Sequence, residues 1–238
     1  MDDINDLFKD EVESKKTVGK AVWGNIDKSA YFHHVVTKSW NGDRIFNREV
    51  AEYRHNLLCK LCDGKGVTLM FSVTMPNHTH DILLTPDWSV LAEVIRVLNS
   101  HVSPVVKRNY PERFQRGRPV FNRNPAYVAL HDPVALLCAG KYVFDNPAYL
   151  KEQNQYVPHS CFWMLERGYL VTPYDEKVLQ KIFGLSAKAL FALYSTNDSK
   201  TVRDFAVRHY SDWPEDRIKA LFYKGVAPQA GSVPPADA

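Results

Sequence analysis

Two apolar segments separated by only three residues constrain the fold of this chain more than any other feature. Residues 67–74, VTLMFSVT, and residues 78–84, HTHDILL, are rich in the β-branched and aliphatic residues typical of strands. Met75, Pro76 and Asn77 connect them, and Pro76 has no N–H group to contribute to a strand ladder. Because so short a connection joins antiparallel strands, we expect a hairpin within a sheet.

The segments on either side of this hairpin alternate between strand and helix signals. The expected elements are a strand at 31–38, a helix from the Asn47 N-cap to about residue 63, a helix after Asp87 that Pro104 kinks or ends, a strand or hairpin at 118–130, and a helix from Asp132 to Pro147. In the first helix, Val50, Tyr53, Leu57, Leu58 and Leu61 form one apolar stripe. This order predicts an α+β domain with one open antiparallel sheet over about residues 28–165.

The remaining segments differ in composition from this domain. Residues 1–28 are polar and acidic at their start, and we expect a flexible leader. Residues 166–225 contain helical patterns near 174–182, 186–195, 199–209 and 214–224, and we expect a helical extension. Part of this extension resembles a helix-turn-helix motif, but a helical lid or interaction module is the favoured interpretation. Residues 226–238, rich in Pro, Ala and Gly, are expected to be disordered.

The composition describes a soluble globular protein, with 45% hydrophobic and 24% charged residues. No apolar run approaches the roughly 20 residues of a membrane span, and the acidic start does not resemble a signal peptide. These features and the four cysteines predict a cytoplasmic protein without structural disulfides. Cys59 and Cys62 form a C-x-x-C pair inside a predicted helix, which favours two buried thiols over a metal site.

His78 and His80 form the first candidate site. Side chains two residues apart in a strand project from the same face, so both imidazoles should lie on the side of Ile82 and Leu84. One interpretation is a half-buried strand with two polar residues at its start. The other is a metal site, because histidine is the commonest metal ligand.

Tyr142 and Asn146 form the second candidate pair. They lie four residues apart on the predicted 132–146 helix and therefore share a face. A metal held by two histidines can accept an amide oxygen as a third ligand and polarise a phosphate. A phenol one helical turn away is then placed to attack that phosphate, with Lys141 and the metal both favouring the phenolate.

Residues 104–124 form a basic stretch with interleaved aromatic side chains. It holds six cations and one acid; the cations are Lys107, Arg108, Arg113, Arg116, Arg118 and Arg123. One interpretation is an ordinary solvated loop. The other is a track for a nucleic-acid backbone, with Tyr110 or Phe114 available to stack on unpaired bases.

Several motifs resemble, in the same order, those of one known family. MPNHTHDILL resembles the metal-binding strands of the HUH-superfamily single-tyrosine transposases (transposase IS200-like family), and KYVFDNP resembles their Tyr-x-x-x-Asn-Pro helix. FHHVVTK, VIRVLNSHV and RGRPVFNRN resemble the family's first strand, second helix and hairpin, with the REP-associated tyrosine transposases as the nearest branch. The resemblance covers about 130 residues, by the approximate bounds of these motifs.

The resemblance implies a ferredoxin-like HUH nuclease fold. It implies Tyr142 as the nucleophile, with His78, His80 and Asn146 binding Mg²⁺ or Mn²⁺. The implied reaction is cleavage and rejoining of single-stranded DNA beside hairpins through a 5′-phosphotyrosine link. The implied partner is hairpin or single-stranded DNA, not a membrane, and the implied state is a monomer or homodimer.

The sequence departs from the family pattern at two positions, and alternatives remain open. Thr79 replaces the usual hydrophobic residue between the histidines, and Asp81 stands where an aliphatic residue is usual. Asp81 should face away from the histidines unless a bulge turns it inward, and Asp145 is a rival third ligand. His33 and His34 lie on the first strand, where one of them can approach the site, but packing within the strand is the favoured role. A hairpin-binding protein that does not cleave DNA is the alternative function, and a relaxase or replication initiator fits less well.

Overall fold

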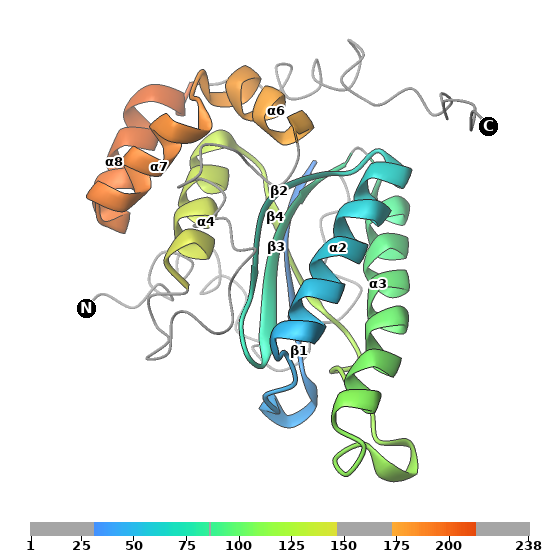
Figure 1. The fold of residues 1–238 in the computed structure, drawn as a ribbon. Helices are drawn as coiled ribbons and strands as arrows, with labels where there is room; N and C mark the ends of the chain where they lie inside the picture. Colours follow the sequence, from blue (N-terminus) through green and yellow to red (C-terminus); the bar gives the residue numbers. More distant parts are fainter. Residues whose placement is uncertain (1–30, 86, 147–172, 213–238) are drawn as a thin grey trace, which may run out of the picture.

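The computed structural model describes residues 31–85, 87–146 and 173–212 (Figure 1). Its strands and helices alternate in the order strand, helix, strand, strand, helix, strand, helix, followed by three further helices. The main elements are β1 (Phe32–Lys38), α2 (Arg48–Lys65), β2 (Thr68–Thr74), β3 (His78–Leu84), α3 (Trp88–Asn109), β4 (Ala126–Leu130), α4 (Pro133–Asp145), α6 (Pro173–Phe183), α7 (Ala187–Thr196) and α8 (Ser199–Tyr210). Two short 3-10 turns, η2 (Trp40–Gly42) and η3 (Gln115–Gly117), lie in the connections.

The four strands form one open antiparallel sheet in the order β2-β3-β1-β4. The β2–β3 hairpin turns at residues 75–77, as the short connection predicts, because Met75 N donates to His78 O at 2.8 Å. With α2 and α3 as the connecting helices, this is the βαββαβ arrangement of ferredoxin-like folds. The predicted α+β fold with an open antiparallel sheet is therefore confirmed.

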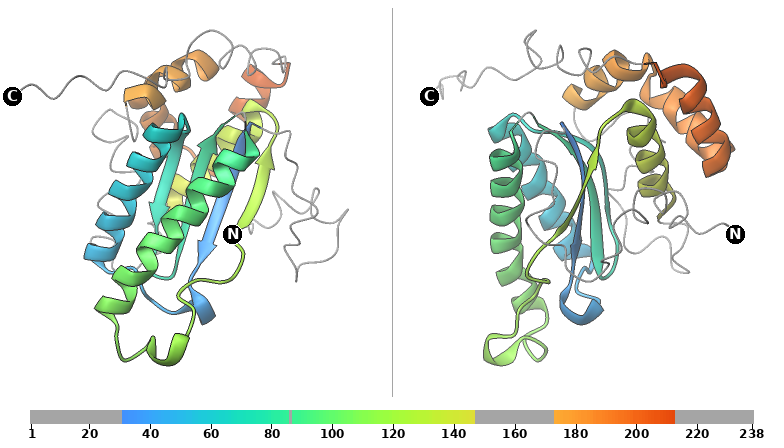
Figure 2. Two further views of the ribbon diagram at one scale, coloured as in Figure 1. Left: turned by 90° about the vertical axis from the view of Figure 1, so that its right-hand side faces the viewer. Right: turned by 180° about the vertical axis from the view of Figure 1, so that it is seen from behind.

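Helices cover both faces of the sheet (Figures 1 and 2). On one face, α2 and α3 pack against each other and bury a core that includes Val35, Leu58, Leu83, Leu91 and Leu98. On the other face, α4 lies against β2 and β3 and is covered in turn by the C-terminal helices. The sheet thus separates two hydrophobic cores, each closed by a different set of helices.

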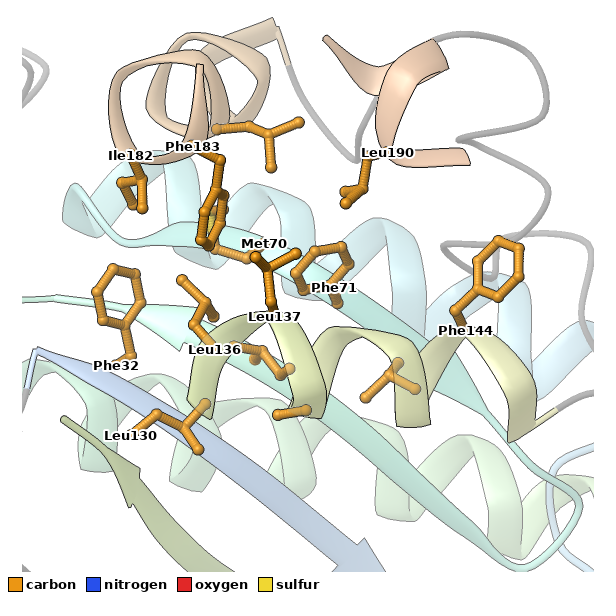
Figure 3. Close-up of a cluster of buried hydrophobic side chains, with 14 of the residues drawn as sticks. Phe32, Met70, Phe71, Leu130, Leu136, Leu137, Phe144, Ile182, Phe183 and Leu190 are labelled. Carbon is orange, nitrogen blue, oxygen red and sulfur yellow. The ribbon is translucent and has the colours of Figure 1, made fainter. Parts of the chain in front are cut away.

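The second core ties the C-terminal helices to the sheet. Its apolar side chains come from all four strands and from α4, α6, α7 and α8, and many of them interdigitate between the sheet and the helices (Figure 3). Tyr194 of α7 is fully buried, and its hydroxyl donates to Leu137 O of α4 at 2.8 Å. Helices α7 and α8 are therefore packed directly on the helix that carries Tyr142, and α6 packs on β2.

The helix starts are confirmed in detail. Asn47, Asp87 and Asp132 each cap a helix with a side-chain oxygen that accepts a backbone N–H, from Val50, Ser89 and Ala135. These caps satisfy N–H groups that have no partner inside the helix. Because each cap fixes the helix start, it also fixes which residues face the sheet.

The structure corrects one prediction about α2 and excludes one of the two alternatives for Pro104 in α3. In α2, Tyr53 is exposed while Arg54 is buried, because Arg54 reaches Asp81 on β3 and forms a buried ion pair with it. In α3, Pro104 does not end the helix, which continues to Asn109. The turn after Pro104 is held because Val105 and Val106 are buried in the core under α2 and α3.

Parts of the predicted organisation lie outside the described residues. The flexible leader at 1–28, the disordered tail at 226–238, Pro147 and the helix near 214–224 all fall there. Within residues 31–85, 87–146 and 173–212, no helix combines the length and hydropathy needed to cross a membrane.

Candidate active site

A cavity of about 840 Å³ opens on the face of the sheet that carries α4. Its wall combines polar side chains from β1, β3 and α4 with the edge of β4. The polar residues include His34, Lys38, Asn77, His78, His80 and Tyr142. Of the sequence-predicted site residues, the cavity therefore brings together both histidines of the H-x-H pair and the tyrosine.

The strand register places the two histidines in this cavity. His78 pairs with Lys38 and His80 pairs with Val36 across β1, so all four side chains project from one face. The imidazole centroids of His78 and His80 are 4.8 Å apart. The shared face expected from the two-residue spacing is thus present in the structure.

Each of these imidazoles is oriented by a hydrogen-bond partner on its Nδ1 atom. His80 Nδ1 lies 2.9 Å from His34 Nε2, and His78 Nδ1 lies 2.7 Å from Asn77 Oδ1. His80 Nε2 is buried and has no hydrogen-bond partner among the described residues.

Burial keeps these imidazoles neutral at ordinary pH. Desolvation by burial, followed by the nearby charge of Lys38, lowers the pKa of His78 to about 4. Desolvation, followed by the neighbouring histidines and Lys38, lowers the pKa of His80 to about 2. A neutral imidazole has a lone pair to give to a metal, whereas a protonated one has none.

Tyr142 approaches the histidines from α4. Its ring centroid lies 5.1 Å from that of His80 and 6.0 Å from that of His34, and the side chain is half-buried. The Asp132 cap and Pro133 start the helix so that Tyr142, nine residues on from Pro133, faces the sheet. A phenol and two neutral imidazoles therefore converge on one cavity from separate elements.

The structure does not place Asn146 on the wall of this cavity. Asn146 is buried at the end of α4, and its Nδ2 donates to Tyr142 O at 2.9 Å. Only its Oδ1 remains for a cation, so its role as third ligand stays a prediction. The carboxylate of Asp145, the rival ligand, accepts a hydrogen bond from Lys141 Nζ at 2.6 Å. This ion pair engages the carboxylate, and it also engages the lysine that was expected to favour the phenolate.

Asp81 projects from the opposite face of the sheet, as expected for its position between His80 and Ile82 in β3. It is fully buried and accepts from Arg54 and from Ser72, whose Oγ lies at 2.7 Å. No bulge turns it toward the histidines, because the β1–β3 register is continuous from His78 to Leu84. Asp81 is thus a structural anchor for α2 and is excluded from the cavity.

His34 is the site residue that the sequence left undecided. Of the adjacent pair His33 and His34, the second faces the cavity and contacts His80, while His33 packs against Trp88 on the other side. Alternation along the strand requires that only one of the two face the H-x-H pair. The sequence carried that signal, but only the register of β1 against β3 shows which one.

These side chains fit a divalent cation in part. His80, through its unpartnered Nε2 atom, and His78 supply two neutral nitrogen donors. The Nδ1 atom of each ring has a hydrogen-bond partner, as is usual for metal-binding histidines. No group of three or more His, Cys, Asp or Glu side chains suited to hold a metal occurs among the described residues. Further ligands would have to be the Asn146 amide, water or phosphate oxygens.

The basic stretch is only partly available to a ligand. Lys107, Arg108 and Arg123 are exposed, whereas Arg118 pairs with Asp43 at 2.8 Å. Arg113 is exposed and stacks over the Tyr110 ring, at 5.1 Å from its centroid. The side chain of Arg116 lies outside the described residues.

The prediction that Phe114 is available for base stacking was wrong. Only 6% of its surface is exposed, and the side chain packs into the core under α2 and α3. The ring is buried because removing its apolar surface from water is favourable. Of the C-x-x-C residues, Cys62 is buried as predicted, whereas Cys59 is only partly buried.

Residues 27–143, just under half of the chain, match the family described as "Transposase IS200 like". No curated protein matches significantly. Similar solved structures include a candidate transposase from Deinococcus radiodurans R1, with 18% identity over 47% of this chain and 85% of that chain and a TM-score of 0.36. Another is a REP-associated tyrosine transposase bound to a REP hairpin, with 12% identity over 51% of this chain and 68% of that chain and a TM-score of 0.37.

Proposed function

Because residues 27–143 carry a domain of the IS200-like transposase family, we propose that this protein cuts and rejoins single-stranded DNA beside hairpins, with Tyr142 as the nucleophile. The observation that supports this most directly is the position of the Tyr142 ring, 5.1 Å from His80, inside one cavity with His78. A transposase must conserve the energy of the bond it breaks, and a covalent tyrosine link does so.

The proposed reaction exchanges one phosphate ester for another. The Tyr142 oxygen attacks a backbone phosphorus, and the bond from that phosphorus to the 3′ oxygen breaks. The phenol loses its proton to water, and the departing 3′ oxygen takes one up as a hydroxyl. The DNA 5′-phosphate then remains on Tyr142, and attack by a 3′-hydroxyl reverses the step and rejoins the strand.

The residues of the cavity have separate roles in this proposal. His78 and His80, with Asn146 as the candidate third ligand, would hold Mg²⁺ or Mn²⁺, which supplies charge stabilisation to the attacked phosphate when bound. Lys38 is exposed on the cavity wall and adds a positive charge for the DNA backbone. The basic residues with exposed side chains, Lys107, Arg108 and Arg123 among them, would contact phosphates farther along the strand.

The decisive experiment incubates the protein with single-stranded hairpin DNA and Mn²⁺ and looks for a covalent protein–DNA adduct. Tyr142→Phe should still bind the hairpin and form no adduct, because it loses only the hydroxyl. Tyr53→Phe, at an exposed position on α2, is the matched control and should behave like the wild type. An adduct that maps to another tyrosine, or cleavage without any adduct, would contradict the proposal.

The third ligand is tested by a pair of neighbouring variants. If Asn146 binds the cation, Asn146→Ala should weaken metal-dependent cleavage more than Asp145→Ala, whose carboxylate is engaged by Lys141. The reverse order would reassign the ligand. Hairpin binding should be unchanged in both variants.

Two observations favour a second candidate function, a hairpin-binding protein that does not cleave. Asn146 Nδ2 caps its own helix, and the described residues hold no group of three His, Cys, Asp or Glu side chains suited to a metal. In that case the wild-type protein should bind hairpin DNA equally well with EDTA or Mn²⁺ and never form an adduct.

A further inference from the structure

A second cavity lies on the other side of strand β4. Its volume is about 790 Å³, and its wall is made by the outer part of α3 and by residues 119–127. Figure 2 shows β4 at the edge of the sheet, with α3 on one side and α4 on the other. We call this second cavity the α3–β4 cleft.

Strand β4 forms a wall shared by the α3–β4 cleft and the candidate active site. Ala126 and Val128 line the active-site cavity, while Tyr127 between them lines the cleft, as the two-residue alternation of a strand requires. Asn122, just before β4, lines both cavities. Because β4 is an edge strand, a ligand can pass around it from one cavity to the other.

The cleft is lined with aromatic rings. Trp88 and Tyr127 are half-buried with ring centroids 4.9 Å apart, and Phe121 contributes a third ring to the wall. Burial raises the pKa of Tyr127 to about 12, so its hydroxyl stays protonated and neutral. Aromatic faces that are partly open to a cavity are suited to stack on flat, apolar ligands.

The charges around the cleft favour an anion. Arg96, Lys107 and Arg123 line it, are exposed, and form no ion pair with any described residue. Its one acidic lining residue, Glu93, is paired with Lys65 at 3.2 Å. A ligand that combines flat rings with regularly spaced negative charges matches both properties.

We propose that the α3–β4 cleft binds unpaired nucleotides of the same DNA strand that enters the active site, stacking a base on Trp88 or Tyr127. The cations of the cleft then contact the phosphates of those nucleotides. A duplex is excluded as the ligand, because its bases are stacked on one another and present no free faces. This proposal rests on the proposed function, because that function identifies the ligand as a DNA strand. The cleft itself is observed independently of the active-site residues.

Photo-crosslinking of the wild-type protein tests this placement directly. Single-stranded hairpin oligonucleotides carrying 5-iododeoxyuridine at successive unpaired positions are bound in EDTA, irradiated and digested, and the linked peptides are identified by mass spectrometry. A label within a few nucleotides of the cleavage point should link to Trp88 or Tyr127. Links confined to peptides outside the cleft, from DNA that is bound, would overturn the proposal.

The affinity for single-stranded DNA of variants that lose one exposed charge provides a second test, because these substitutions leave the hydrophobic core unchanged. Arg96→Ser should bind the single strand more weakly, and the slope of log affinity against log salt should fall by about 0.7 for one lost phosphate contact. Arg48→Ser is the control, because Arg48 is also exposed but pairs with Glu52 on α2 and does not line the cleft. Wild-type affinity and slope in both Arg96→Ser and Arg123→Ser would also overturn the proposal.

The two proposals fail in distinguishable ways. An adduct on Tyr142 without any crosslink in the cleft supports the proposed function and refutes the cleft as a DNA-binding site. Crosslinks in the cleft without an adduct support the cleft and contradict the cleaving function.

Discussion

Gly140 is the position at which a single methyl group should disturb the candidate nucleophile. It lies inside α4, where alanine is ordinarily favoured over glycine by about 1 kcal/mol. A Cβ at this position, however, would lie 2.5 Å from Tyr194 Oη and 2.8 Å from Phe71 Cε2. Neither ring can move aside easily, since both are fully buried and the Tyr194 hydroxyl is bonded to Leu137 O.

The steric term should therefore outweigh the helix propensity. Overpacking of a well-packed core costs about 1–3 kcal/mol, and two contacts below 3.0 Å put this site at about 2–3 kcal/mol. After the gain of about 1 kcal/mol in helix propensity, Gly140→Ala should destabilise the protein by about 1–2 kcal/mol net. The matched control is Gly64→Ala in α2, where a Cβ meets nothing within 4 Å, and this variant should gain up to about 1 kcal/mol. Urea unfolding followed by circular dichroism measures both differences.

A coupled variant shows whether the contact with Tyr194 is the cause. Tyr194→Phe removes the Oη atom, so the double variant with Gly140→Ala should be less destabilised than the sum of the two single variants. Because Tyr142 is two residues from Gly140, adduct formation should fall in Gly140→Ala and not in Gly64→Ala. If Gly140→Ala is as stable as the wild type, α4 is not held against β2 and α7 as described.

Three further predictions concern stability. Asp81→Asn should cost about 3–5 kcal/mol in urea unfolding, because it leaves the Arg54 guanidinium buried without its charged partner, and a loss under 1 kcal/mol would contradict that pairing. Burial lowers the pKa of His34 to about 4 and that of His80 to about 2. Below pH 6.5 the unfolded chain therefore binds more protons than the folded one, and stability falls. In metal-free buffer we expect a loss of up to about 3 kcal/mol between pH 7.5 and 5.5, and a free energy of unfolding that does not change with pH would refute this. Pro104→Ala should raise the free energy of unfolding by about 1 kcal/mol or more, since it restores an N–H donor at an exposed position inside α3, and a loss of stability would indicate that the proline shapes the helix.

Local sequence rules determined most elements and part of the candidate site. The three-residue connection required a hairpin, and the cap residues Asn47, Asp87 and Asp132 set the starts of three helices. The two-residue period of a strand put His78 and His80 on one face. These features depend on backbone geometry within a few residues, which is why the sequence alone predicts them.

The tertiary structure decided what those faces meet. The sequence placed Tyr53 in the core and left Arg54 unnoticed, yet the ion pair with Asp81 turns that arginine inward. It left open which of His33 and His34 reaches the active site, and only the pairing of β1 with β3 selects the second. Periodicity fixes which side chains share a face, but the partner across that face comes from a distant segment. Long-range strand pairing and helix packing, rather than local pattern, therefore completed the cavity.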